Sequence, residues 1–459
     1  MPTVDIILIV LFLAAMVIVG LWPGKIRGRE AFLISDRNLG GVSTGFTIAA
    51  SKIGGGLLVT YSTLVFTFGY SALWLFVGYV IGYTLFYIYA RSLQQEAKAH
   101  GYYTMADFFQ MRFGKAAGIA VGLGCAISMT GWIFTNLIAG GDLIATLTNI
   151  SSLKATLLMA APMAVYLLVG GFHSVVKTDI LQYIAMMVIF VVITVAMGNL
   201  ETPKIAATAT KPMAGGMIFN FILLGALFPM GSAELWQRAY AARDRKGLFV
   251  GIGIASVTFI VLGLALSFIC LSLRETTLAD GSVAAQLGLV KGVAQSVGPI
   301  LTGLWIIAFM AAIISSADTF VFTTASALVE DVFERAGILR RDQRITGMRV
   351  VIILLCGVGV LGAVAFKSVV TVAFFYAGVT MSLGVVALLA RFTRRLGGTG
   401  IAVALLAGLV ASTCEAFSSG VTARTASVNA GVTLLVALLA LAFPTKKSQP
   451  QPQAERGHL

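Results

Sequence analysis

Charged residues are scarce in this sequence. Only 11% of its 459 residues are Asp, Glu, Lys or Arg, whereas a soluble protein carries about 25%. Hydrophobic residues account for 58% of the chain. This balance excludes an ordinary soluble domain and predicts an all-α protein that crosses the membrane many times.

Cysteine and histidine are also rare, and their spacing indicates no metal or disulfide site. The four cysteines each lie alone in an apolar run without a CxxC spacing, and the three histidines lack metal-ligand spacing. We find no phosphate-binding loop, nucleophile–base pair or pore-filter motif, so neither an enzyme nor a channel is indicated. Met1 to Gly20 lacks a basic segment and a cleavage site, so we expect the first helix to be retained.

Thirteen apolar segments are long enough to cross about 30 Å of hydrocarbon at about 1.5 Å per residue. They cover residues 4–22, 41–68, 71–92, 116–147, 154–170, 174–198, 216–238, 247–273, 297–330, 348–366, 369–391, 399–419 and 427–444. Most of the 32 Lys and Arg residues fall in the loops on one side of these spans. The positive-inside rule then predicts an outer N-terminus and an inner C-terminus. The net charge of +13 is therefore a topology signal and does not indicate nucleic-acid binding.

The stretch from Phe46 to Leu58, FTIAASKIGGGLL, is the most unusual part of an apolar span. A lysine in the middle of a membrane span is costly, so Lys52 is expected to be functional. Gly54, Gly55 and Gly56 allow the backbone to leave helical geometry, which is tolerated at this depth only beside a cavity or within protein. We therefore predict a broken helix that carries a solute site. The alternative is a glycine-rich packing face with a lysine that reaches toward the membrane surface.

A second interruption is predicted at Phe228-Pro229-Met230-Gly231, because proline removes a backbone donor and clashes with the preceding turn. The two interruptions open two five-helix sets of opposite orientation, which favours an inverted-repeat transporter over two unrelated kinks. The predicted organisation is a peripheral helix and inner loop (1–40), a first repeat (41–198), an outer loop (199–215), a second repeat (216–391), two peripheral helices (392–445) and a disordered cytoplasmic tail (446–459). Two further segments, 97–115 and 274–298, are expected to form short helices outside the bilayer.

Polar residues inside two other spans share helix faces. Ser315, Asp318 and Thr319 have i, i+3, i+4 spacing. Their oxygens are hard ligands suited to an alkali cation. Asp179 lies in another apolar span with Gln182 at i+3. Serine and threonine also join membrane helices without binding ligands, but buried carboxylates must be paired or must bind something.

Four segments make the chain resemble the sodium:solute symporter family, whose members have a LeuT-type 5+5 inverted-repeat fold. They are DRNLGG (36–41), GGFHSVVKTDILQ (170–182), ELWQRAYAARD (234–244) and AAIISSADT with ALVEDVF (311–333). The resemblance covers nearly the whole chain and implies Na⁺-coupled transport.

The resemblance also implies positions for ions and for a gate. The main sodium site would be formed by the carbonyls of Ala50, Ile53 and Ala312 with the hydroxyls of Ser315 and Ser316. Some members hold a second cation, which here would lie near Asp179, Asp318 and Thr319. The inner aromatic gate would fall near Phe228.

Two positions depart from the family's pattern, which has a neutral or acidic residue at Lys52 and a serine or threonine at Asp318. A new cation and a new anion suggest a pair, so we expect Lys52 to pair with Asp318 or Asp179 in one conformation and to separate from it in another. These three residues would then be coupling residues, and Lys52 could release a proton during the cycle. Alternatively, Lys52 anchors a substrate carboxylate while sodium drives uptake, or its ammonium replaces one sodium.

The sequence therefore predicts a symporter in which Na⁺, or H⁺, moves with a small solute held between the two breaks. We expect a monomer in the cell (inner) membrane, with the solute and lipid as its partners and no nucleic acid. Lys52 favours an organic acid or amino acid over a choline-like cation, and a sugar stays open. A transporter-like solute sensor that acts through a separate chain is the alternative. The expected solute-site residues are Lys52, Gly54, Gly55, Gly56, Trp74, Phe76, Thr130, Trp132, Phe228, Met230 and Gly231.

Overall fold

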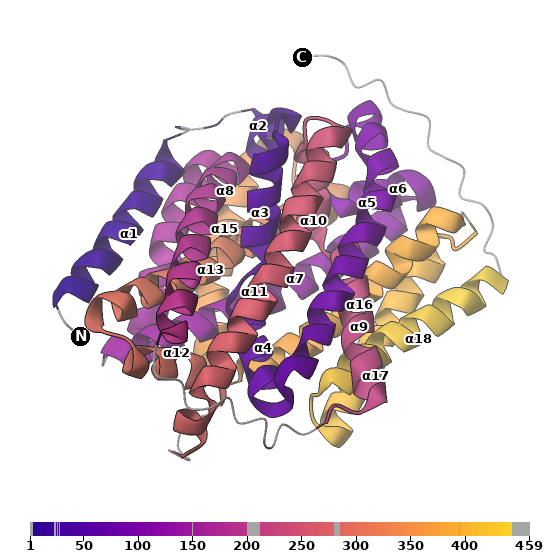
Figure 1. Cartoon of the computed structure of the whole chain (residues 1–459). Helices are drawn as coiled ribbons and strands as arrows, with labels where there is room; N and C mark the ends of the chain where they lie inside the picture. The colour runs from indigo at the N-terminus through magenta and orange to yellow at the C-terminus, as the bar shows by residue number, and fades with distance from the viewer. Residues whose placement is uncertain are drawn as a thin grey trace.

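A computed structural model describes residues 3–22, 24, 26, 28–148, 150–199, 212–279, 285–366, 368–393 and 395–442. These residues form helices joined by short turns, and no named strand occurs among them (Figure 1). The helices are α1 (Thr3–Leu21), α2 (Arg29–Ile34), α3 (Gly41–Lys52), α4 (Gly55–Phe68), α5 (Trp74–His100), α6 (Met105–Phe113), α7 (Lys115–Thr148), α8 (Ser152–Gly198), α9 (Gly215–Gly231), α10 (Ala233–Ala241), α11 (Arg245–Ala279), α12 (Ala285–Ser296), α13 (Pro299–Ser326), α14 (Glu334–Ala336), α15 (Arg344–Ala365), α16 (Val369–Phe392), α17 (Gly398–Ser419) and α18 (Ala423–Ala442).

Nine helices of the described residues are long and apolar enough to cross a membrane, or ten when the bent pair α9–α10 is taken as one span. The sequence predicts thirteen segments because it separates elements that run on in the structure. Ser152–Gly198 contains the predicted segments 154–170 and 174–198, and Gly55–His100 contains 71–92 together with the second part of 41–68. Helix α1 (19 residues) is not among the nine, which are drawn only from residues whose side chains the structure describes. Within α8, Gly171 has non-helical angles (φ 54°, ψ −135°), so the chain bends between the predicted segments 154–170 and 174–198.

The first predicted break is present. Helix α3 ends at Lys52, Gly54 is extended (φ −110°, ψ 177°), and α4 begins at Gly55. The side chain of Asn136 on α7 accepts a hydrogen bond from the Gly55 amide at 2.8 Å. A backbone donor freed by the break is thereby satisfied inside the protein, which is the condition for non-helical backbone at membrane depth.

The second break is also present, but it lies further along the chain than predicted. Helix α9 continues through Pro229 to Gly231, and the chain turns at Ser232 (φ −84°, ψ 99°) before α10 begins. The two helices meet at an angle of 49°. Proline removes only one backbone donor, so the helix continues for two residues beyond it. The Trp236 indole donates to the carbonyl of Met230 at 2.8 Å and spans the turn.

Helix α13 lies at the centre and contacts α7, α8 and α3. Helix α9 packs against α5 and α16, while α17 and α18 pack on each other. Figure 1 shows α1 at one edge of the molecule and α18 at the other. The two broken helices therefore lie among the inner elements, where a site can be shielded from lipid.

The short helices expected outside the bilayer occur with altered bounds. Helix α5 runs to His100, and α6 begins after Thr104, which caps it together with Asp107. On the other side, α11 extends to Ala279 and α12 follows. The predicted tail (446–459) and residues 200–211 of the predicted outer loop lie outside the described residues. The predicted repeat boundaries stay predictions.

Candidate functional site

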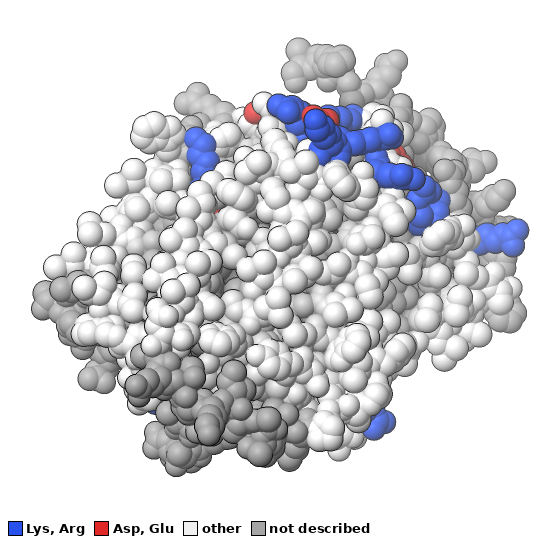
Figure 2. Space-filling view, in the orientation of Figure 1, with Lys and Arg blue, Asp and Glu red and all other residues white. Residues whose placement is uncertain are grey.

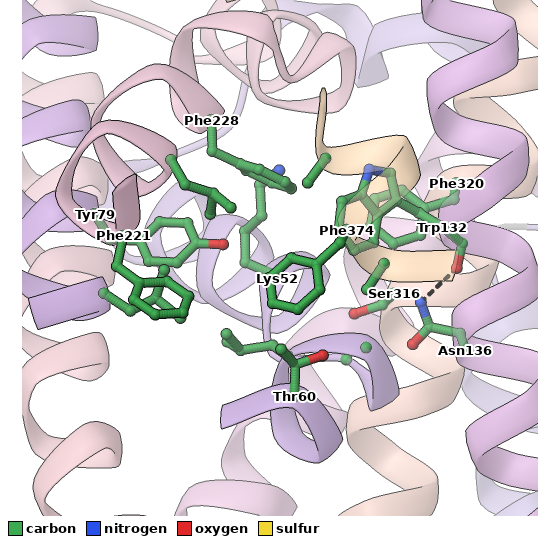
Figure 3. Close-up of a pocket in the computed structure, with 17 residues that line it drawn as sticks. Lys52, Thr60, Tyr79, Trp132, Asn136, Phe221, Phe228, Ser316, Phe320 and Phe374 are labelled. Carbon is green, nitrogen blue, oxygen red and sulfur yellow. Dashed lines mark hydrogen bonds between the residues drawn. The ribbon is translucent and has the colours of Figure 1, made fainter. Parts of the chain in front are cut away.

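A cavity with an empty volume of about 600 Å³, including its open mouth, lies beside the two breaks (Figure 3). Aromatic side chains form much of its wall. Its lining comes from α3, α4, α5, α7, α9, α13, α16 and the first break. The lining residues are Lys52, Gly54, Gly56, Leu57, Thr60, Leu75, Tyr79, Trp132, Asn136, Phe221, Leu224, Phe228, Ser316, Phe320, Ala373, Phe374 and Ala377.

Lys52 brings a positive charge to this cavity. Its Nζ forms an ion pair with Glu234 Oε1 and donates to Ser232 Oγ at 2.6 Å. The Ser232 hydroxyl in turn donates to the carbonyl of Phe228 at 2.7 Å, and Nζ lies 4.5 Å from the centre of the Phe228 ring. The side chains of Lys52 and Glu234 are 3% and 0% exposed, so water does not screen the pair.

Each charge of this pair stands at the helix end that suits it. Lys52 is the last residue of α3, and Glu234 is in the first turn of α10. A cation at a helix C-terminus and an anion at an N-terminus each gain about 0.3–1 kcal/mol from the helix dipole. The ion pair therefore joins the two broken helices at their interruptions.

In this conformation Lys52 pairs with neither Asp318 nor Asp179, so their pairing in another conformation stays a prediction. Asp179 is paired with Arg238 on α10, whose Nη2 lies 2.9 Å from Asp179 Oδ2. Arg238 also donates to Thr47 on α3 at 2.9 Å and to Thr319 on α13 at 2.8 Å. Sequence spacing could not show that Arg238 binds Asp179, Thr47 and Thr319. The four residues lie on α10, α8, α3 and α13, which only the fold brings together.

Asp318 is bound by hydroxyl groups. Tyr166 donates to its Oδ2 at 2.5 Å, and Thr178 lies 3.4 Å from the same oxygen. Asp179 Oδ1 and Asp318 Oδ1 have no hydrogen-bond partner among the described residues. Two of the three residues predicted for a second cation, Asp179 and Thr319, therefore accept hydrogen bonds from the Arg238 guanidinium, which takes the place of a cation beside them.

The residues predicted for the main sodium site do converge. Ser315 Oγ donates to the carbonyls of Ala50 and Ala312, both at 3.0 Å, and Ser316 Oγ donates to the carbonyl of Ala50 at 3.3 Å. All four residues are buried. Ile53 follows at the break itself. Hydroxyls and carbonyls beside an unwound segment are suitable ligands for Na⁺, so the donor set fits this ion.

The predicted solute residues divide into two groups. Lys52, Gly54, Gly56, Trp132 and Phe228 line the cavity. The others do not line it. Gly55 faces Ala139, Trp74 is 41% exposed, and Phe76 packs on Tyr61 and Phe259. Thr130 donates to the carbonyl of Ala126, Met230 is buried and its carbonyl accepts from Trp236, and Gly231 lies against the carbonyl of Thr380.

The sequence interpretation missed Glu234, Arg238 and Asn136 as site residues. Glu234 and Arg238 stand in the segment ELWQRAYAARD and inside the predicted span 216–238, so a survey of charges within spans would have found them. Asn136 gives no comparable signal, because a single amide in an apolar helix does not reveal which backbone group it bonds.

Two broken helices that join a charged cavity to a cluster of neutral oxygens are the arrangement of a LeuT-type transporter. A solved structure described as a substrate-bound, outward-open Na⁺-coupled sialic acid symporter has this fold, with a TM-score of 0.81, 14% identity, and coverage of 97% of this chain and 98% of that one. The sequence profile of the sodium:solute symporter family matches residues 32–408, and the chain belongs to this family. Its helices make it a multi-pass membrane protein, and the family to which it belongs consists of symporters, not enzymes.

Relatives of this chain transport different solutes. The osmoregulated proline transporter OpuE of Bacillus subtilis (strain 168) is 24% identical over 431 residues, covering 87% of this chain and 86% of that protein. High affinity choline transporter 1 of Homo sapiens is 24% identical over 369 residues, covering 72% of this chain and 62% of that protein. The match to the choline transporter of Torpedo marmorata covers 41% of that protein, so the chain spans less than two thirds of these choline transporters.

Proposed function

We propose that this chain is a sodium-coupled symporter that imports a small carboxylate-bearing solute by alternating access. The observation that carries the proposal is the ammonium of Lys52, which lines an aromatic cavity beside the Ser315–Ser316 oxygen cluster. A carboxylate bound in the cavity would meet this ammonium. Phe228, which packs edge-on against Trp132 and Tyr79, would serve as the inner gate.

Sodium and solute would be coupled through the first break. Ala50, whose carbonyl joins the oxygen cluster, and Lys52, which lines the cavity, are two residues apart at the end of α3. A Na⁺ that ties Ala50 to α13 would hold this end in place and so order the solute site. Sodium moving inward contributes about 2.3 kcal/mol per charge for each 100 mV of membrane potential.

The position of Lys52 also bears on whether sodium is needed. Its Nζ binds Ser232 and Glu234, not the serine pair of α13. This favours a mechanism in which Na⁺ and Lys52 both act over one in which the ammonium replaces the ion. We retain Na⁺ as the coupling ion, with H⁺ or sodium-independent transport as the alternative.

We further propose that the basic end of the molecule faces the cytoplasm of a cell, with the protein working as a monomer. Figure 2 shows Lys and Arg gathered at the end where α2 lies. Exposed groups near this end are held together, since Lys98 donates to the carbonyl of Arg243 at 2.5 Å and Arg245 donates to Gln95. This distribution follows the positive-inside rule.

Purified protein in proteoliposomes tests the proposal. An inward Na⁺ gradient should drive accumulation of a labelled carboxylate solute above its external concentration, and the same vesicles without the gradient should only equilibrate. Binding without accumulation would instead indicate a solute sensor. Uptake that is equal with choline in place of Na⁺ would refute sodium coupling.

A further inference from the structure

The Lys52–Glu234 pair has unused hydrogen-bonding capacity at both ends. A lysine ammonium has three N–H donors, and among the described residues Glu234 and Ser232 accept two of them. The third donor has no hydrogen-bond acceptor among the described residues, although Nζ also lies 4.5 Å from the centre of the Phe228 ring, so it is available to a group bound in the cavity that Lys52 lines. Figure 3 shows the ammonium at the end of its chain beside Phe228, with the Tyr79 hydroxyl directed toward the same space.

Glu234 has a matching free acceptor. Its Oε2 is buried and has no hydrogen-bond partner among the described residues. Glu234 is not itself a lining residue and adjoins the cavity through Lys52, whose Nζ binds its other oxygen, Oε1. The nearby guanidinium of Arg238 does not satisfy it, because Arg238 binds the main-chain carbonyl of Glu234 at 3.2 Å and the side chains of Asp179 and Thr319. A buried carboxylate oxygen without a donor is costly, which favours a ligand that supplies one.

We propose that the solute is a zwitterion, an amino acid whose carboxylate accepts from Lys52 and whose ammonium donates to Glu234. This inference rests on the proposed function and chooses between the organic acid and the amino acid that it allows. The pair itself is neutral, so a simple carboxylate would stand beside Glu234 as a second negative charge, and a simple amine would stand beside Lys52 as a second positive one. A molecule with both groups satisfies the free donor and the free acceptor and adds no net charge.

The rest of the cavity suits the apolar part of such a molecule. Phe221, Leu224, Phe374 and Ala377 line it without offering a side-chain polar group. A sugar would need several hydrogen-bonding partners around its ring. Three polar side chains of the lining already donate to protein groups: Trp132 to Thr380, Asn136 to the carbonyl of Trp132, and Ser316 to the carbonyl of Ala50. Beside Lys52, the lining offers a sugar mainly the hydroxyls of Thr60 and Tyr79, and much of the wall is left to apolar contact.

Matched compounds test the inference directly in the wild-type protein. Purified protein in NaCl would be titrated with glycine, proline and leucine, with the acids lacking the amine (acetate, cyclopentanecarboxylate, 4-methylpentanoate) and with the amines lacking the carboxylate (methylamine, pyrrolidine, 3-methylbutylamine). We expect at least one amino acid to bind tenfold or more tightly than both of its counterparts. An acid that binds as tightly as its parent amino acid overturns the zwitterion inference and keeps the proposed function. Binding by none of the nine compounds overturns both.

The variant E234Q then tests whether the ammonium of the bound amino acid contacts Glu234. We expect the ratio of amino-acid to acid affinity to fall at least tenfold, with the acid binding more tightly than it does to the wild type. E330Q is the matched control, because Glu330 is also a buried, ion-paired glutamate, but its partners Arg29 and Arg344 do not line the cavity, whereas Lys52, the partner of Glu234, does. An unchanged ratio in folded E234Q, judged by gel filtration, contradicts the assignment.

Discussion

At the scale of single residues, the site depends on charges that are buried only because each has a partner. Lys52 forms an ion pair with Glu234, and Arg238 forms one with Asp179. Removing both members of a buried pair is often tolerated, whereas removing one leaves an uncompensated charge. The contribution of each charge to stability therefore has to be measured by comparing the single variant with the variant that removes both members of the pair.

Lys52→Met illustrates this dependence. The variant leaves Glu234 buried without its cation, and breaking a buried pair in this way costs about 3–5 kcal/mol. We expect a clear loss of thermal stability in detergent, and recovery of most of it in the double variant K52M/E234Q, while both variants lose uptake. K98M is the control at an exposed lysine. A double variant no more stable than K52M would show that the two charges are not coupled.

Ser316→Ala tests the main cation site. The hydroxyl is one of the oxygens around Ala50, so its loss should raise the Na⁺ concentration for half-maximal uptake about tenfold, which corresponds to about 1.4 kcal/mol. The control is Thr324→Ala, since Thr324 lies on the same helix and is buried but bonds the carbonyl of Phe320. Equal sodium dependence in both variants would place the ion elsewhere.

The sequence was informative about isolated features and weak about partnerships. A lysine followed by three glycines predicts a break from local chemistry alone, and the Ser315–Ser316 pair converges on Ala50 as the family resemblance implies. The partner of Lys52 could not be predicted in the same way. Several carboxylates lie at similar depth, and only the packing of α10 against α3 selects Glu234.

At the scale of elements, the molecule is organised by two interruptions that do not have the same cause. The first uses glycine to create space, because a Cβ at Gly54 would lie 2.5 Å from both Asn136 Oδ1 and Ser316 Oγ. The second turns at Ser232, after a proline that the helix itself accommodates. This is why the first break was placed correctly from sequence and the second was placed early.

Gly54→Ala should therefore damage the first break. An added methyl group would push Asn136 and Ser316 away from their partners, and we expect uptake to fall at least tenfold together with Na⁺ affinity. Gly253→Ala is the matched control, because a methyl group added to Gly253 on α11 would meet no described neighbour within 4 Å and alanine favours helix. The check is the initial rate of uptake at equal protein in the membrane. Normal uptake by G54A would mean that the close approach is not required.

At the scale of the whole molecule, the break, the cation cluster and the cavity form one unit at the crossing of helices from distant parts of the chain. The cluster joins α3 to α13, the ion pair joins α3 to α10, and Arg238 joins α10 to α8. A cation or solute that binds here contacts several elements at once. Binding can therefore change the relative stability of the two conformations that alternating access requires.

The net charge moved per cycle tests how these parts work together. One Na⁺ carried with a neutral zwitterion moves one positive charge inward, and at 100 mV, inside negative, this adds about 2.3 kcal/mol, or a roughly 50-fold increase in the accumulation ratio. We expect a potassium diffusion potential of that sign to raise accumulation in proteoliposomes, and the opposite sign to lower it. A monoanion carried with one Na⁺ would move no net charge, and neither would a zwitterion carried without a cation. Accumulation that ignores the potential would therefore exclude the combination of one Na⁺, a neutral solute and an intact Lys52–Glu234 pair.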